Sequence, residues 1–346
     1  MNRNNLNRKE FYIKKQKKRK KITVIVCAIL VLGIGIFAIS RAFSSSDDKV
    51  IANAKNDDTQ KENTEKQKPK VIGPNDIIPG DNIIKSAESY AVPANIVYKM
   101  ISSKEVVKEP KSVFLTFDDG PSENTDELLN ILKNEGVHAT FFVLGSQLEN
   151  SDKNRERLKR EIDEGNAIAN HSYSHNYKIL YPGNSVNPSK FMEEFNKTNK
   201  LMQDVLGKDF DSKVVRMPGG YISRKYYKDP HLKELDKDFK ENNIVSIDWD
   251  AETGDATGRN YSVQQMVNNV SAYAKSEKHM VLLMHDAAAK KQTVKALPAI
   301  IKYLKSQGYE FKVISNSKPE DKEKQDSSVS NNQNNENNQT ANKTGK

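Results

Sequence analysis

Five short stretches of the sequence contain acidic, histidine and arginine side chains of the kinds that hydrolytic enzymes use. They are "TFDDG" (116–120), "HSYSH" (171–175), "RMPGG" (216–220), "DAETGD" (250–255) and "LLMHD" (282–286). Carboxylates and imidazoles can hold a divalent cation, and they can also move the protons that hydrolysis of an amide or ester requires. The stretches therefore predict a hydrolytic site, provided that the fold brings them together.

The two histidines of the second stretch suit a metal site. His171 and His175 stand in the i, i+4 relation that would place both imidazoles on one face of a helical turn. Taken alone, an exposed histidine pair without a metal is at least as good an interpretation. With an aspartate from another strand end, the pair forms a two-histidine, one-carboxylate set that suits Zn²⁺ and leaves positions open for water and substrate. A second carboxylate and a separate histidine could then serve as base and acid for a metal-bound water whose pKa is lowered to about 7.

Strands and helices alternate from Lys111 to Ser315, in a pattern that can bring these stretches together. The apolar runs that we expect to be strands are 113–117, 139–144, 167–170, 214–217, 244–249, 280–284 and 311–315. The expected helices are 123–135, 152–164, 188–206, 232–242, 262–276 and 291–307. Alternation of this kind indicates parallel strands joined by right-handed crossovers. We predict an α/β domain with a small, distorted (β/α) barrel of about seven parallel strands; an open doubly wound sheet is the alternative.

All five stretches lie at or just after the ends of predicted strands. In a parallel β/α fold, the carboxyl ends of the strands meet at one rim, and active sites form there. The paired acids Asp118 and Asp119 follow an apolar run, so they predict a site at this rim, although Asp, Gly and Pro also favour a simple turn. His285 follows another apolar run, where the competing interpretation is a core histidine with satisfied hydrogen bonds.

In this order, the five stretches resemble the motifs of the polysaccharide deacetylases, the NodB-homology domains of carbohydrate esterase family four. The resemblance covers about Lys111 to Ser315 and implies the distorted barrel typical of NodB domains. It also implies that Asp119, His171 and His175 bind a divalent metal, for which Zn²⁺ is the first choice and Co²⁺ or another divalent ion the alternative.

The resemblance assigns roles to further residues. It implies that Asp118 is the catalytic base and that Arg216 orients it. His285 would be the general acid, with its pKa tuned by Asp255. The backbone N–H of Gly219 would help to bind the oxyanion. Plain alternatives exist for two of these residues, because Arg216 could form a surface ion pair and Asp255 could be a loop acid or helix cap.

Two positions depart from the family pattern. The third motif usually has an aromatic residue after its proline, where this sequence has Gly219 and Gly220. The fourth motif often ends in Asp-Trp, whereas Asp255 is followed by alanine and the only tryptophan, Trp249, comes earlier. Oxyanion binding needs only an N–H and can survive the first change, but that wall of the groove should be thinner. Tyr221 or Trp249 could supply the missing sugar-stacking surface; simple packing is the alternative for both.

The N-terminal region predicts a membrane anchor. Residues 1–21 hold ten of the 55 Lys and Arg and one of the 46 Asp and Glu, and an uncharged apolar stretch follows at 22–40. About 19 residues at 1.5 Å per residue span roughly 28 Å, close to the hydrocarbon core of a bilayer. The basic flank places the N-terminus in the cytoplasm and the rest outside. A cleaved signal peptide is the alternative.

The remaining segments complete the predicted organisation. Residues 41–80 and 317–346 are polar and poor in large apolar side chains, so we expect a disordered linker and a disordered tail. Residues 81–110 form an accessory strand or helix, and 111–316 form the catalytic domain, expected to be monomeric. Beyond residue 21 the chain has 45 basic and 45 acidic residues, so nucleic-acid binding is disfavoured.

These inferences predict an anchored, extracellular, metal-dependent deacetylase of N-acetylglucosamine in cell-wall peptidoglycan. Alternative substrates are N-acetylmuramic acid, poly-N-acetylglucosamine, chitin oligomers and acetyl-xylan esters. A glycan-binding module without activity is the alternative from another class; it would be expected to lack the base or a ligand, and this sequence lacks neither.

Overall fold

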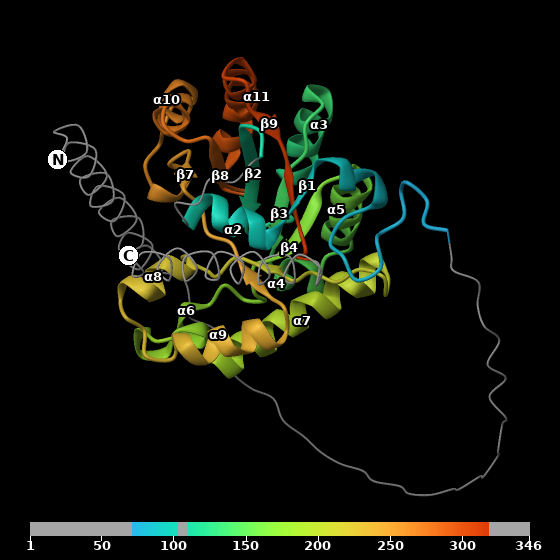
Figure 1. Cartoon of the computed structure of the whole chain (residues 1–346), viewed down its shortest axis with the longest axis vertical. Coiled ribbons are helices and arrows are strands. Elements are labelled where there is room, and N and C mark those ends of the chain that lie inside the picture. Colours follow the sequence, from blue (N-terminus) through green and yellow to red (C-terminus); the bar gives the residue numbers. More distant parts are fainter. Residues whose placement is uncertain (1–70, 103–108, 318–346) are drawn as a thin grey trace, which may run out of the picture.

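The computed structural model describes residues 71–102 and 109–317 of the chain (Figure 1). The predicted anchor at 22–40 lies outside these residues, as do most of the predicted linker and nearly all of the predicted tail. Within the described residues, no helix has the length and apolar character needed to cross a membrane.

The centre of the fold is a curled, parallel sheet of seven strands. Along the sheet the order is β6-β5-β4-β3-β2-β8-β7, with the short β9 paired to the start of β2, while β1 and β10 form a separate parallel pair. The strands are β1 (Ala91–Pro93), β2 (Ser112–Asp118), β3 (Thr140–Val143), β4 (Ala167–Asn170), β5 (Val214–Val215), β6 (Val245–Ser246), β7 (Ala251–Glu252), β8 (His279–His285), β9 (Glu310–Phe311) and β10 (Val313–Ser315). The prediction of about seven parallel strands is confirmed.

Helices surround the sheet (Figure 1). The helices are η1 (Lys85–Tyr90), α2 (Ala94–Ser102), α3 (Thr125–Glu135), α4 (Gly145–Glu149), α5 (Asp152–Asp163), α6 (Tyr177–Leu180), η2 (Pro182–Asn184), α7 (Pro188–Leu206), α8 (Tyr221–Tyr226), α9 (Leu232–Glu241), η3 (Asp255–Thr257), α10 (Val263–Ala274) and α11 (Lys291–Ser306). The six helices that the sequence predicts correspond to α3, α5, α7, α9, α10 and α11. The short helices α4, α6 and α8 were not predicted.

The two edges of the sheet are close, which makes it a half-barrel. β6 ends at Ser246 and β7 begins at Ala251, yet β6 pairs with β5 at one edge and β7 with β8 at the other. Five residue steps of extended chain reach at most about 18 Å, so the edges must curl toward each other. The strand predicted over 244–249 is present only as β6, because the rest of this stretch leaves one edge and crosses toward the other.

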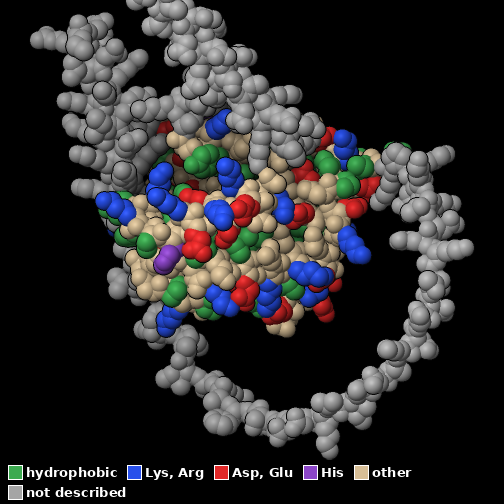
Figure 2. All heavy atoms as spheres, turned by 60° about the horizontal axis from the view of Figure 1, so that its bottom comes forward, with side chains coloured by type: hydrophobic (Ala, Val, Ile, Leu, Met, Phe, Trp, Pro, Cys, Tyr) green, Lys and Arg blue, Asp and Glu red, His purple; other side chains and the backbone are tan. Residues whose placement is uncertain are grey.

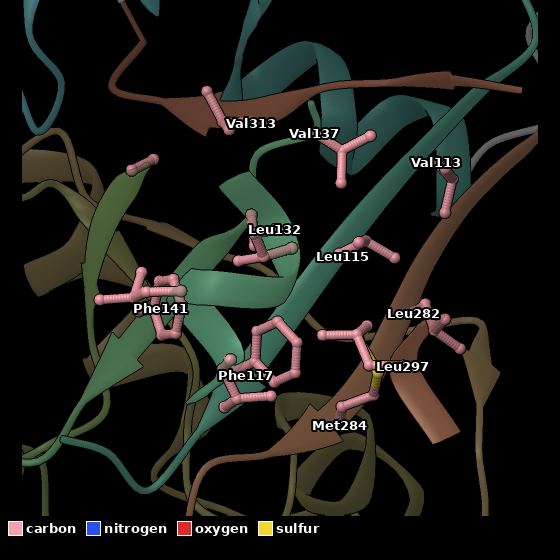
Figure 3. Close-up of a cluster of buried hydrophobic side chains, with 14 of the residues drawn as sticks. Val113, Leu115, Phe117, Leu132, Val137, Phe141, Leu282, Met284, Leu297 and Val313 are labelled. Carbon is pink, nitrogen blue, oxygen red and sulfur yellow. The ribbon is translucent and has the colours of Figure 1, made fainter. Parts of the chain in front are cut away.

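Side chains of β2 alternate between two apolar clusters. Val113, Leu115 and Phe117 lie in the cluster between the sheet and the outer helices, beside Leu282 and Met284 of β8 (Figure 3). Phe114, by contrast, belongs to the cluster inside the half-barrel, where Val97 of α2 also packs. Because successive strand side chains point to opposite faces, Thr116 and Asp118 share the inner face with Phe114. β2 thus leads to a carboxylate inside the half-barrel.

The segment before β2 is part of this folded unit. β1 pairs with β10 in parallel, and Asn82, fully buried, donates hydrogen bonds to the carbonyls of Ile168 and Ile314. Residues 71–80, which the composition assigned to the linker, also pack here: Ile77 forms a bridge to Ile84, and Gly80 accepts a hydrogen bond from Asn316. The folded unit therefore begins before residue 81.

Candidate active site

The last residue of β2 is the centre of a buried charge pair. Asp118 is 3% exposed, and its Oδ1 accepts a hydrogen bond of 2.7 Å from Nη1 of Arg216, which follows β5 and is fully buried. Nη1 of Arg216 also donates to Thr116, and its Nε donates to the carbonyl of Ile247 at 3.0 Å. The guanidinium lies 4.0 Å above the ring centroid of Phe142. The side chain of Arg216 is thus held from several directions.

A buried ion pair of this kind stabilises a fold little, because removing two charges from water costs several kcal/mol per ion. The alternative interpretation, in which Arg216 forms a surface ion pair, is wrong, since neither Arg216 nor Asp118 is exposed. The geometry fixes the orientation of the Asp118 carboxylate and leaves its second oxygen 3.7 Å from Nε2 of His171.

The chain turns sharply after Asp118. Asp119 has a φ of 75°, in the left-handed region that few residues other than glycine adopt. A Cβ at Gly120 would lie 2.4 Å from Oδ2 of Asp286, so this position cannot hold a side chain without a shift. The N–H of Asp286 donates to the carbonyl of Asp118, and its carboxylate accepts from Ser122 and Thr125. The turn lets two adjacent carboxylates reach one pocket, which a regular strand would not allow.

The two histidines lie in a loop after β4, and the helical relation predicted for them is wrong. Ser172 and His175 have φ values of 67° and 53°, so two of the five residues adopt the left-handed conformation and the stretch is not a helical turn. The ring centroids of His171 and His175 are nevertheless 5.1 Å apart. The left-handed residues, which are strained for side chains other than glycine, bring the rings together where a helical turn would otherwise do so.

The geometry of Asp119, His171 and His175 fits a divalent cation. Oδ1 of Asp119 lies 3.6 Å from Nε2 of His171 and 3.7 Å from Nε2 of His175, and one ligand atom from each residue falls within 4.8 Å of the others. Two ligands of a tetrahedral Zn²⁺ are about 3.4 Å apart, given bonds of about 2.0–2.1 Å. Oδ1 of Asp119 is buried and has no hydrogen-bond partner among the described residues, as expected for a metal ligand.

The protonation of His171 also suits a ligand. Its Nδ1 lies 2.7 Å from the carbonyl of Arg216, which directs Nε2 toward Asp119. Burial, together with the nearby His175, lowers the pKa of His171 to about 3, although Asp119 acts in the opposite direction. The imidazole is therefore neutral at physiological pH, which is the form that binds metals.

Helix α7 holds the histidine loop through one carboxylate. Glu194 is mostly buried, and its Oε2 accepts hydrogen bonds from the N–H groups of Tyr173 and Ser174 at 3.1 and 2.9 Å. Its Oε1 accepts from the hydroxyl of Ser174 at 2.6 Å. On the other side of the loop, the Asn170 side chain accepts from the N–H of Ser172. Glu194 was not predicted as a site residue, because a glutamate in the middle of a helix is normally expected to be exposed to solvent.

A second charged pair lies at the end of β8. Nδ1 of His285 is 2.9 Å from Oδ1 of Asp255, whose other oxygen accepts from the N–H of His285 and from Thr293. Burial lowers the pKa of His285, but the charge and hydrogen bond of Asp255 outweigh it and, with Asp119 and Asp118, raise the pKa to about 9. Burial likewise raises the pKa of Asp255, and its contacts with His285 bring it below the usual value. In the sheet, His285 and Asp118 are directly paired in register.

The remaining predicted residues surround the turn after β5. Gly219 and Gly220 both have positive φ values, and a Cβ at Gly219 would lie 2.3 Å from the Tyr177 hydroxyl. A Cβ at Gly220 would lie 3.1 Å from the ring of Trp249, so this ring covers the glycine turn.

Tyr221 begins α8 and lies just beyond this turn. Its hydroxyl donates to Asp236 of α9, and its ring packs on the apolar cluster beneath α7. Its N–H and that of Ile222 donate to the two carboxylate oxygens of the half-buried Asp248, which was not predicted from the sequence. The structure therefore brings Trp249 against the turn and directs the polar end of Tyr221 toward α9.

A curled β/α sheet that gathers paired acids and histidines at the carboxyl ends of its strands is typical of an enzyme active site. A sequence model of the polysaccharide deacetylases matches residues 105–235. A peptidoglycan-N-acetylglucosamine deacetylase of Bacillus cereus is 33% identical over 220 residues, which cover 61% of this chain and 90% of the relative. A second Bacillus cereus protein with the same description is 34% identical over 209 residues, 59% of this chain and 69% of the relative.

Solved structures agree with this assignment. A CE4 esterase from Streptococcus mutans superposes with a TM-score of 0.63 at 37% identity, over 70% of this chain and all of that one. The catalytic domain of a peptidoglycan N-acetylglucosamine deacetylase from Eubacterium rectale superposes with a TM-score of 0.54 at 29% identity, over 63% of this chain and 94% of that one. The chain belongs to the polysaccharide deacetylases, and it is a hydrolase.

Proposed function

We propose that this enzyme removes the acetyl group from N-acetylglucosamine residues of cell-wall peptidoglycan and releases acetate. The observation that carries the proposal is the division of the site into separate functional groups. The cation cluster uses Asp119, His171 and His175. Asp118 is instead tied to Arg216, and His285 is tied to Asp255. Hydrolysis of an amide needs these three parts: a cation site, a base and an acid.

Asp119, His171 and His175 would hold the cation, with Zn²⁺ favoured by the mixed nitrogen and oxygen ligands and Co²⁺ as the alternative. When bound, the cation lowers the pKa of a water molecule and polarises the acetyl carbonyl. Asp118 accepts the proton of the attacking water through the oxygen that Arg216 does not engage. The N–H of Gly219 donates to the developing oxyanion.

His285 acts as the general acid. Its raised pKa keeps the ring protonated near neutral pH, so a proton is available for the leaving amine. Because Nδ1 faces Asp255, the proton is donated from Nε2. Asp255 keeps the ring oriented and stabilises its positive charge.

The proposed substrate rests on the descriptions of the relatives, several of which are peptidoglycan N-acetylglucosamine deacetylases. Trp249 would form the sugar-binding wall, whereas Tyr221 packs on the apolar cluster beneath α7. We also propose that residues 22–40 anchor the chain in the cell membrane with the N-terminus in the cytoplasm, so that the catalytic domain faces the wall. This topology follows from the charge step at Lys21.

Acetate release from matched glycans tests the proposal. Purified full-length protein, loaded with Zn²⁺ or Co²⁺, is incubated separately with peptidoglycan, poly-N-acetylglucosamine, chitin oligomers and acetyl-xylan, and the modified sugar is identified by mass spectrometry. We expect the highest kcat/KM on peptidoglycan, with glucosamine as the new sugar. Deacetylated muramic acid, or a higher kcat/KM on another glycan, would replace the proposed substrate.

A further inference from the structure

Two helices beside the active site present an unusual surface to solvent. α6 begins two residues after His175, and α8 begins directly after the Gly219-Gly220 turn. Among the described residues, six large hydrophobic side chains are exposed, and four of them lie on α6, on α8 or directly after α8. These four are Ile179, Ile222, Tyr226 and Tyr227. We call this region the α6/α8 surface.

Lysines are interspersed with these apolar side chains. Lys178, Lys225 and Lys228 are exposed, and none of the three has an acidic partner within 4 Å among the described residues. Most other exposed lysines of the longer helices are paired, as Lys200 is with Asp204. In Figure 2, Lys and Arg side chains lie beside hydrophobic ones at the left of the face shown, where Figure 1 places α8. The α6/α8 surface therefore combines exposed apolar side chains with lysines that have no acidic partner among the described residues.

The α6/α8 surface is held firmly from below. The guanidinium of Arg224, which is almost fully buried, lies 4.6 Å from the ring centroid of Tyr181 and donates to the carbonyl of Asn184 at 2.8 Å. The hydroxyl of Tyr181 donates to the carbonyl of Pro218 in the turn before α8. α6 and α8 are thus joined to each other and to the catalytic turn. A partner bound on this surface would be placed in a defined position relative to the active site.

We propose that the α6/α8 surface binds the part of the glycan strand beyond the reacting sugar, and that it selects strands that carry carboxylates. This inference rests on the proposed function, because the peptide stems of peptidoglycan bear carboxylates that chitin and poly-N-acetylglucosamine lack. Exposed tyrosines such as Tyr226 offer flat apolar faces to pyranose rings, and Lys225 and Lys228 offer positive charge to the carboxylates. The surface makes the enzyme prefer peptidoglycan over neutral glycans of the same backbone.

An anionic membrane is the other partner that tyrosines and lysines could suit. Continuity with the catalytic turn favours the glycan. α8 begins directly after the Gly219-Gly220 turn, so a strand bound on α8 would lie next to the turn that is proposed to bind the reacting group.

The test changes charge on the surface and on the substrate separately. The double variant Lys225→Gln/Lys228→Gln is compared with Lys295→Gln/Lys302→Gln, which removes two exposed lysines of α11, on another side of the fold in Figure 1. Each protein is assayed on peptidoglycan, on peptidoglycan whose carboxylates have been converted to methylamides, and on chitin oligomers. Cosedimentation with insoluble peptidoglycan measures binding without turnover.

We expect the α8 double variant to raise KM for peptidoglycan about 5-fold to 10-fold at low salt, since each exposed ion pair contributes modestly. The effect should shrink at high salt and disappear on the methylamide substrate and on chitin oligomers. Tyr226→Ala should weaken binding of all three substrates. The α11 variant should behave as wild type.

Several outcomes would overturn the inference. An equal rise in KM on charged and neutral glycans would show that the lysines do not recognise carboxylates. Unchanged cosedimentation and kinetics, together with lost binding to anionic phospholipid vesicles, would assign the surface to the membrane. If wild-type protein deacetylates only neutral glycans, the proposed function fails; lysine-dependent cosedimentation with peptidoglycan would still support the surface, and its absence would refute it.

Discussion

Removal of the Glu194 carboxylate should weaken metal binding although this residue does not touch the cation site. Glu194 accepts three hydrogen bonds from the histidine loop, two from backbone N–H groups and one from the Ser174 hydroxyl. The loop contains left-handed residues at Ser172 and His175, so it needs external support to keep the two rings together. In Glu194→Ala the loop loses all three bonds, and His175 should lose its fixed position.

The expected magnitude follows from these contacts. A hydrogen bond to a charged group contributes about 1.5–3 kcal/mol, and neighbouring bonds do not add fully. Loss of a residue that orients a metal ligand typically lowers affinity about 10-fold to 100-fold, which corresponds to about 1.4–2.8 kcal/mol. The three lost bonds can supply that energy. Glu194→Gln should lose less, because its carbonyl oxygen can still accept from the N–H groups of Tyr173 and Ser174.

Zinc competition titrations of the purified variants measure the effect directly, and circular dichroism of the metal-free proteins checks folding. Glu193→Ala is the matched control, since Glu193 is exposed on α7 and its one ion pair within 71–102 and 109–317 is with Lys190. At saturating metal, Glu194→Ala should recover kcat to within a few-fold of wild type. Wild-type affinity in Glu194→Ala, or activity that stays low at saturating metal, would refute the reasoning.

Three further predictions concern ionisable side chains. Asp119→Asn should lose metal affinity by at least tenfold, whereas Asp118→Asn should keep it and lose nearly all turnover; equal metal loss in a zinc titration would contradict the separate roles. His285→Ala should keep its metal and lose about 10²–10⁴ in kcat, and a parallel fall in bound metal would make it a ligand. Burial, with the charge of Asp286, raises the pKa of Glu161 well above its usual value, and no described residue bonds to its carboxyl oxygens. The contribution of Glu161 to stability should therefore fall as pH rises above about 4.3, so in urea unfolding at several pH values the stability of wild type relative to Glu161→Gln should decrease with rising pH; a pH-independent difference would contradict this.

The sequence predicted the fold where a strong pattern coincided with tertiary packing. β2 and β8 are long apolar runs, and both appear within two residues of their predicted bounds. Amphipathic helices such as α7 were located to the residue at both ends, because Asn187 caps its start and Gly207 follows its end. The prediction that five stretches meet at one rim followed from the geometry of parallel strands, and their positions at or just after β2, β4, β5, β7 and β8 agree with it.

Other features depend on contacts that a local pattern does not contain. The stretch 244–249 has the apolar character of a strand, but only two residues pair with β5 before the chain leaves the edge. The spacing of His171 and His175 suits a helix, and the left-handed backbone that replaces it is imposed by Glu194 and Asn170 from other elements. Asn170 is only two residues from Ser172, but Glu194 lies 20 residues or more along the chain from the N–H groups that it accepts from, so a local sequence pattern does not reveal it.

The glycines that depart from the family pattern illustrate how a change at one position is balanced by a distant residue. A side chain at Gly219 would collide with the Tyr177 hydroxyl, and one at Gly220 would press on the ring of Trp249. The aromatic rings beside the turn are thus those of Tyr177, the first residue of α6, and of Trp249, in the segment between β6 and β7. Tyr177 also lies 5.7 Å, between ring centroids, from His175, so the same ring touches both the turn and a candidate metal ligand. The space beside the two glycines is therefore occupied by the side chains of Tyr177 and Trp249. Small residues are required at positions 219 and 220 because a larger side chain would collide with these rings.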